Sequence, residues 1–260
     1  MKLYKKDTPL TLSRDAIRLF FAANFYFMAK IMGIDFELES EYIVLGSILL
    51  FGPFFCGWAC PFGSASYFAT RIGNKLFPKL QFNIPQPYDS WLRMIRYPLL
   101  VFFLYLFVIK GVSYFGDHIE MYKSTAFSWN YIQAKHLAVL LVPFFIPNFF
   151  CKYMCFQKAG YNLINKAFKI LKIKRNSETC ISCGKCDRVC PMQVNPSGKT
   201  EICGGDCLNC FNCLDNVCPP KADALSLEFL GFKVKPGIFA ALAMAVYLTA
   251  TYLVLFVYQW

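Results

Sequence analysis

Long uncharged runs dominate the pattern of polar and apolar positions along the chain. They cover residues 42–70, 236–260, 136–151, 97–109 and 19–29. A helix needs about 20 apolar residues to cross the hydrocarbon core of a bilayer. The pattern therefore predicts five transmembrane helices, at about residues 17–34, 42–59, 96–115, 132–150 and 237–258.

Composition favours the same interpretation. Hydrophobic residues make up 57% of the chain and charged residues only 17%, whereas soluble domains average about 45–50% apolar and about 25% charged residues. The net charge of +11 is compatible with either nucleic acid or a membrane surface as a partner. No basic cluster lies on an element that would read a nucleic acid, so we expect lipid contact and no nucleic-acid partner.

The distribution of charge between the apolar runs predicts an orientation. Basic residues are concentrated in residues 1–18, 60–96 and 152–235, while residues 35–41 contain acidic residues and no basic one. Cytoplasmic loops of membrane proteins carry the excess of Lys and Arg. We therefore expect a multi-pass protein of a bacterial-type cytoplasmic membrane, with the N-terminus and residues 152–235 cytoplasmic and Trp260 outside.

The second and fourth predicted helices end alike, in the pattern FF-C-x-aromatic-x-C. The cysteines of the two copies are Cys56, Cys60, Cys151 and Cys155. This similarity predicts two repeated helical hairpins, residues 1–60 and 96–155. A C-x3-C pair on a helix presents both thiols on one face. Three interpretations remain open: a third metal or iron–sulfur site, a redox-active or quinone-contacting site, and cysteines that pack as small hydrophobic side chains.

A run of the form C-x2-C-x2-C-x3-C-P begins at Cys180, and a second run, with x4 before its last cysteine, begins at Cys207. This is the spacing of bacterial two-cluster ferredoxins, in which the fourth cysteine ligates the other cluster. We therefore assign one [4Fe-4S] cluster to Cys180, Cys183, Cys186 and Cys218. The other is assigned to Cys207, Cys210, Cys213 and Cys190. Zinc also takes thiolates, but it usually uses two C-x2-C pairs, and two interlocked sets of four fit it poorly.

These observations predict an all-α integral membrane bundle with an inserted small α+β ferredoxin-like domain. Residues 1–158 form the module of two repeated hairpins, residues 159–235 the cytoplasmic two-cluster domain, and residues 236–260 a C-terminal transmembrane helix. Cys203 is either a spare thiol or a replacement ligand for the irregular second run.

The two C-x3-C segments, CGWACP at 56–61 and CKYMC at 151–155, together with the two ferredoxin runs, resemble NapH-type membrane proteins and their NosR-type relatives. The resemblance covers roughly residues 17–219. It implies a quinol dehydrogenase component of periplasmic nitrate reductase or nitrous oxide reductase systems, an oxidoreductase subunit that oxidises quinol. It also implies periplasmic or membrane-bound redox subunits as partners.

We accordingly expect an iron–sulfur electron-transfer subunit that relays electrons between the quinone pool, or a cytoplasmic donor, and an extracytoplasmic reductase or its partner. Two alternatives stay open. The C-x3-C thiols suit a soft metal such as copper, which would make the chain a metal-reducing or cofactor-maturation factor. In the second alternative, the chain is a passive cluster-bearing scaffold of a larger redox complex.

Overall fold

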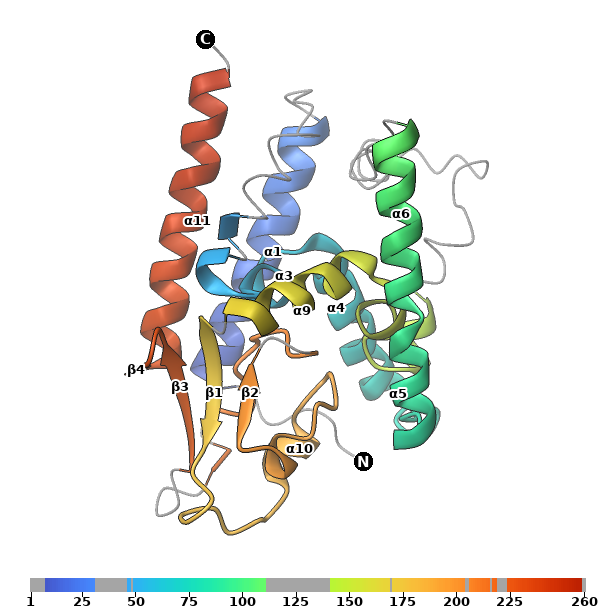
Figure 1. Cartoon of the computed structure of the whole chain (residues 1–260), viewed down its shortest axis with the longest axis vertical. Coiled ribbons are helices and arrows are strands. Elements are labelled where there is room, and N and C mark those ends of the chain that lie inside the picture. Colours follow the sequence, from blue (N-terminus) through green and yellow to red (C-terminus); the bar gives the residue numbers. More distant parts are fainter. Residues whose placement is uncertain are drawn as a thin grey trace.

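The computed structural model describes residues 8–30, 46–47, 49–110, 141–168, 170–203, 206–215, 217–218 and 224–258. Helices precede and follow a small sheet, and the long helices α1, α6 and α11 extend away from it in the same direction (Figure 1). The helices before the sheet are α1 (Pro9–Lys30), α3 (Phe54–Trp58), α4 (Pro61–Leu76), α5 (Gln86–Met94), α6 (Arg96–Lys110), the π-helical turn η1 (Phe150–Met154) and α9 (Phe156–Phe168). Those within or after it are α10 (Lys185–Arg188), the 3₁₀ turn η2 (Pro196–Gly198) and α11 (Pro236–Tyr258).

The sheet has four strands in the order β2-β1-β3-β4, and every neighbouring pair is antiparallel. The strands are β1 (Leu171–Arg175), β2 (Glu201–Cys203), β3 (Leu225–Phe229) and β4 (Phe232–Val234). Alternation along β1 buries Leu171 and Ile173 on one face, as the two-residue period of a strand requires. The sheet lies within residues 159–235, where the sequence predicts an α+β unit.

An aromatic cluster joins the N-terminal helices to the segment that follows β2. The rings of Phe54 and Trp58, both in α3, stack with centroids 5.0 Å apart. Phe211 contacts both rings, and Phe239 at the start of α11 contacts Phe54 and Phe211. Helix α3, the second cysteine run and α11 therefore share one hydrophobic core.

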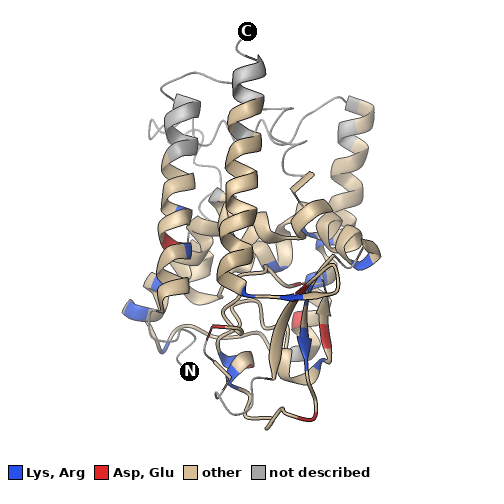
Figure 2. Cartoon of the chain, turned by 90° about the vertical axis from the view of Figure 1, so that its left-hand side faces the viewer, with Lys and Arg blue, Asp and Glu red and all other residues tan. Residues whose placement is uncertain are grey.

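Charged side chains gather at the end of the molecule that contains the sheet, as Figure 2 shows. Several of them are buried there. Asp89 and Arg93 of α5 form an ion pair of 2.6 Å, and Asp206 pairs with Arg93 at 2.8 Å and with Arg96 of α6. These ion pairs connect α5 and α6 to Asp206, which directly precedes the second cysteine run.

The predicted all-α transmembrane bundle is wrong. Within the residues described above, no helix combines the length and the apolar character needed to cross a membrane. They form ten helical segments and one small antiparallel sheet. The multi-pass membrane location, with its cytoplasmic and outer sides, depended on those helices and is wrong for the same reason.

Helix α11 matches the predicted helix at 237–258 in extent, whereas other predicted helices differ from the observed ones. Gly52, with φ of +64°, and Pro53 interrupt the run over 42–59, which leaves α3 with only five residues. Helix α1 begins before the predicted helix and buries Arg14 and Arg18. Helix α6 covers Arg96–Lys110, and residues 111–115 of the predicted helix lie outside the described residues. Most of the predicted helix at 132–150 lies outside the described residues.

Candidate metal centres

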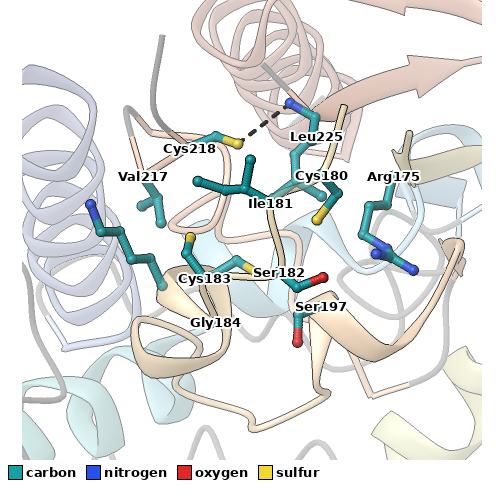
Figure 3. Close-up of a pocket in the computed structure, with 13 residues that line it drawn as sticks. Arg175, Cys180, Ile181, Ser182, Cys183, Gly184, Ser197, Val217, Cys218 and Leu225 are labelled. Atoms are coloured by element: carbon teal, nitrogen blue, oxygen red, sulfur yellow. Dashed lines mark hydrogen bonds between the residues drawn. The ribbon is translucent and has the colours of Figure 1, made fainter. Parts of the chain in front are cut away.

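The first of two cysteine-lined pockets lies at the edge of the sheet. Its lining includes the set Cys180, Cys183, Cys186 and Cys218, and about 370 Å³ of space lies between the lining atoms, part of it open to solvent. Figure 3 shows the labelled cysteines on different sides of this pocket, with Ser182 and Gly184 on the loop between them. We call it the first site. The structure thus brings together four cysteines that the spacing assigns to one cluster.

The first site is close to the surface. Cys183 is exposed and the neighbouring Ile181 side chain is 64% exposed. The backbone N–H of Ala224 donates to Cys218 Sγ at 3.4 Å. A hydrogen bond from Arg175 lowers the pKa of the Cys180 thiol, whereas burial and then the nearby Asp187 carboxylate raise the pKa of Cys186 to about 11.

The second pocket, the second site, lies deeper, between the sheet and α3. Its cysteines are the other predicted set, Cys190, Cys207, Cys210 and Cys213, around about 350 Å³ of space. Three of these four cysteines are buried in the hydrophobic core. Burial raises the pKa of the Cys207 thiol to about 12, so a metal that binds there must displace its proton.

Both cysteine loops have the same backbone conformation. Ser182 and Gly184 flank Cys183, and Asn209 and Phe211 flank Cys210 at equivalent positions; all four have φ between +51° and +62°. Residues in this left-handed region, alternating with right-handed ones, turn successive backbone N–H groups into a concavity that favours anions, as at many iron–sulfur sites. Gly184 suits this conformation, whereas Phe211 is held in it by the aromatic core.

Residues far away in the sequence hold the second loop in place. The side chain of Arg14 donates to the carbonyl oxygen of Cys210 at 2.9 Å, and Trp58 Nε1 donates to that of Asn209 at 2.9 Å. The backbone of Gly57 packs so closely that a Cβ there would overlap the carbonyl oxygen of Leu208. Sequence reasoning missed these three supports. Gly57 and Trp58 belong to the CGWACP segment at 56–61, which is already recognisable as a motif in the sequence. The residues around Arg14 form no motif that would indicate its role.

The four cysteines of the two repeats also come together, and we call them the four-thiol group. Cys60 and Cys155 each lie in extended conformation between a short helix and a longer one, with ψ of 120° and 101°. The backbone N–H of Gly63 donates to Cys60 Sγ at 3.4 Å. Burial raises the pKa of the Cys155 thiol, and the backbone of Lys158 partly offsets this rise. The two copies therefore place their second cysteine at the start of the following helix in the same way.

Electrostatic coupling shows that the group is compact. Burial, followed by the charges of Cys155, Cys60 and Cys56, raises the pKa of Cys151. The charge of Lys158 opposes the rise for both Cys56 and Cys151. The four thiols, of which Cys151 is buried and the others are partly buried, therefore share one environment with Lys158, while Arg18 acts on Cys60 and Arg96 on Cys155.

Cys203 is the last residue of β2, in register with Lys172 of β1. Among the described residues, no three His, Cys, Asp or Glu side chains are placed to hold a single metal ion. A structural zinc needs thiolate sulfurs about 2.3 Å from one point. By this criterion the described residues contain no mononuclear zinc site.

Comparison with known proteins places this arrangement in a family. A family model described as a 4Fe-4S binding domain matches residues 42–79 and 136–176, the two segments that carry the C-x3-C pairs. The chain is 31% identical over 181 residues to YccM of Escherichia coli (strain K12), whose name places it in electron transport; this covers 66% of the chain and 50% of YccM. No solved structure matches significantly.

Two further relatives belong to the NosR and NapH types that the sequence resembles. The regulatory protein NosR of Pseudomonas aeruginosa is 29% identical over 67% of the chain and 26% of NosR. The ferredoxin-type protein NapH of Haemophilus influenzae is 27% identical over 72% of the chain and 65% of NapH. The chain thus spans half or less of the length of YccM and NosR. With the 4Fe-4S domain and the cysteine-lined pockets, these relatives show that the chain belongs to the NapH/NosR-type family of iron–sulfur electron-transfer proteins.

Proposed function

We propose that the chain binds two [4Fe-4S] clusters, one at each site, and relays single electrons between two redox partners. The ligands would be Cys180, Cys183, Cys186 and Cys218 at the first site. Those of the second site would be Cys190, Cys207, Cys210 and Cys213. The observation that carries this proposal is the crossed pairing: each pocket is lined by three cysteines of one run and the last cysteine of the other.

Three properties of the sites fit such clusters. Thiolates are the ligands that iron–sulfur clusters use. The repeated positive-φ residues aim backbone N–H groups at each site, where they would stabilise an anionic group. Both sites have room for more than one atom. When bound, the clusters supply one-electron chemistry, and the protein positions them and sets their surroundings.

The first site is the better place for exchange with another protein, because the exposed Cys183 and Ile181 bring its edge to the surface. The likeness to NosR and NapH supports redox partners from nitrate or nitrous oxide reduction. We keep the proposed division into residues 1–158, 159–235 and 236–260, with the cysteines of both sites in the middle unit. Nothing in the described residues marks a quinone site.

Crossed cysteine variants test the proposal. In the full chain, purified without oxygen, we expect about eight iron atoms and two EPR-active clusters. Cys190→Ser should remove the second cluster although Cys190 belongs to the first run, and Cys218→Ser should remove the first. Cys203→Ser serves as the matched control and should keep both. An iron-free wild-type chain, or loss of the first cluster in Cys190→Ser, would refute the assignment.

A second candidate function belongs to the four-thiol group, which we propose as a third metal or redox site. Its support is the mutual electrostatic influence of Cys56, Cys60, Cys151 and Cys155 from both repeats, which are buried or partly buried, together with the match of the 4Fe-4S model to those segments. Soft metals, including Cu(I), favour such thiols. Stoichiometric binding of iron or copper that is lost in Cys56→Ser, with both clusters retained, is the expected result. Equal metal content in Cys56→Ser and wild type would leave these cysteines structural.

A further inference from the structure

Three cations are buried in the described structure without a carboxylate partner. Arg18 is 2% exposed, and Lys152 and Lys158 are each 1% exposed. Every hydrogen bond that they donate goes to a neutral oxygen. Arg18 donates to the carbonyl oxygen of Gly57, and Lys152 Nζ donates to the side-chain oxygen of Gln193 at 2.7 Å.

Each of these cations lies near one cysteine of the second site. Lys158 Nζ donates to the carbonyl oxygen of Cys207. Arg18 is close enough to Cys210 to act on it electrostatically. Lys152 acts in the same way on Asp89, Cys190 and Asp206. Arg18 also acts on Cys60 of the four-thiol group, and Lys158 on its Cys56. The three cations come from α1, η1 and α9, and therefore approach the site from separate elements.

An isolated charge is costly to bury, and proteins normally pair it. Elsewhere in the described interior this rule is followed, since Arg93 and Arg96 pair with Asp206. Three cations that form no salt bridge with a described residue lie beside this pocket, and an anionic occupant would balance their charge. A cluster held by four thiolates is such an anion, and it gains one more negative charge when it is reduced.

The first site differs chiefly in exposure. It also has cations nearby: Arg175 beside Cys180, Lys185 in the pocket lining, and Arg188, which donates to the carbonyl oxygen of Cys183 at 3.3 Å. Lys185 and Arg188 are exposed, and one acid, Asp187, lies beside Cys186. Solvent reaches the exposed Cys183 and screens these charges. Burial disfavours an added negative charge at the second site, but the same low dielectric strengthens its attraction to three nearby cations.

We propose that Arg18, Lys152 and Lys158 are the permanent counter-charge of the second site and make it the electron acceptor of the pair. This inference rests on the proposed function. A reduced one-electron carrier protein delivers an electron at the exposed first site. That electron then passes to the second site, so that the first is oxidised and the second reduced by one electron, without transfer of a proton or breaking of a bond. The three residues act as positioning residues and none is a ligand.

The test is an EPR-monitored redox titration of the full chain with both clusters present. In wild type, the cluster that is lost in Cys190→Ser should have the higher potential. Lys158→Met keeps the length of the side chain and removes its charge, and it should lower that potential enough to change the electron distribution between the sites about tenfold, or 59 mV. Lys158→Arg should restore the wild-type value. Lys166→Met, at an exposed lysine of the same helix, should leave it unchanged.

The possible outcomes separate this inference from the proposed function. A wild-type chain without two clusters refutes the proposed function itself. Two clusters with the second at the lower potential, or with a potential that Lys158→Met leaves unmoved, overturn only the counter-charge inference. If Lys158→Met fails to fold, the same shift is measured in Lys152→Met. Selective loss of the second cluster in a folded Lys158→Met chain, with recovery in Lys158→Arg, supports the requirement for the charge.

Discussion

Replacement of Gly57 by alanine tests how tightly α3 holds the second site. The new Cβ would overlap the carbonyl oxygen of Leu208, and it would lie 3.3 Å from the carbonyl carbon of Leu208 and 3.4 Å from the nitrogen of Cys210. All these atoms are backbone, so no side chain can rotate away. Either α3 or the loop that carries Cys207 and Cys210 must therefore move.

The cost has two parts. Overpacking in a well-packed interior costs about 1–3 kcal/mol. A displaced Gly57 carbonyl would also weaken its hydrogen bonds from Arg18, and hydrogen bonds to charged groups contribute about 1.5–3 kcal/mol. We expect Gly57→Ala to lower the free energy of unfolding by about 3–5 kcal/mol, which is roughly a 10 °C decrease in Tm for a chain of this size.

Thermal unfolding followed by circular dichroism measures the decrease, and EPR reports whether the second cluster is selectively lost. Gly160→Ala in α9 is the matched control, because its Cβ would meet only Leu100, at 3.8 Å. An alanine inside a helix ordinarily stabilises it by about 1 kcal/mol over glycine, so the two variants should change Tm in opposite directions. Equal behaviour of the two variants would show that the contact between α3 and the second loop is not tight.

Three other predictions follow from the same contacts. Asp206→Asn should cost about 3 kcal/mol in chemical denaturation, because it leaves Arg93 and Arg96 buried without their shared carboxylate; an unchanged midpoint would contradict this. Trp58→Phe should cost about 1 kcal/mol through loss of the hydrogen bond to Asn209 while both clusters remain, and loss of a cluster would assign Trp58 a larger role. Removal of iron by a chelator should unfold the cysteine loops before the helices, which hydrogen exchange can follow, because ligand binding supplies folding energy to such loops.

The cysteine spacing was informative because it constrains short loops. Three cysteines at x2 intervals must curve around one centre, and the pockets contain the same two sets of four that the spacing predicts. The small sheet near 171–234 also lies where an α+β unit was expected. These features depend on contacts within a few dozen residues.

Hydropathy alone did not predict where helices end or which charged residues are buried. An uncharged run over 42–70 does not reveal that Gly52 adopts positive φ and that Pro53 follows it, which ends one helical segment before α3 begins. The interior roles of Arg18 and Lys158 were equally hidden. Their partners lie 39 and 49 residues away in the sequence, and a single sequence gives no sign of which charges will be buried together.

The contact between helix α1 and the cysteine loop of the second site has a consequence for the order in which the two sites mature. The hydrogen bond from Arg14 to Cys210 joins residues 196 positions apart, and closing so large a loop is slow. The first site is lined only by residues 175–225, whereas the loop of the second site also needs Arg14 and Trp58 from the distant N-terminal helices. We therefore expect maturation in a fixed order, with the outer site loaded first and the inner one completed only after α1 and α3 have packed against its loop.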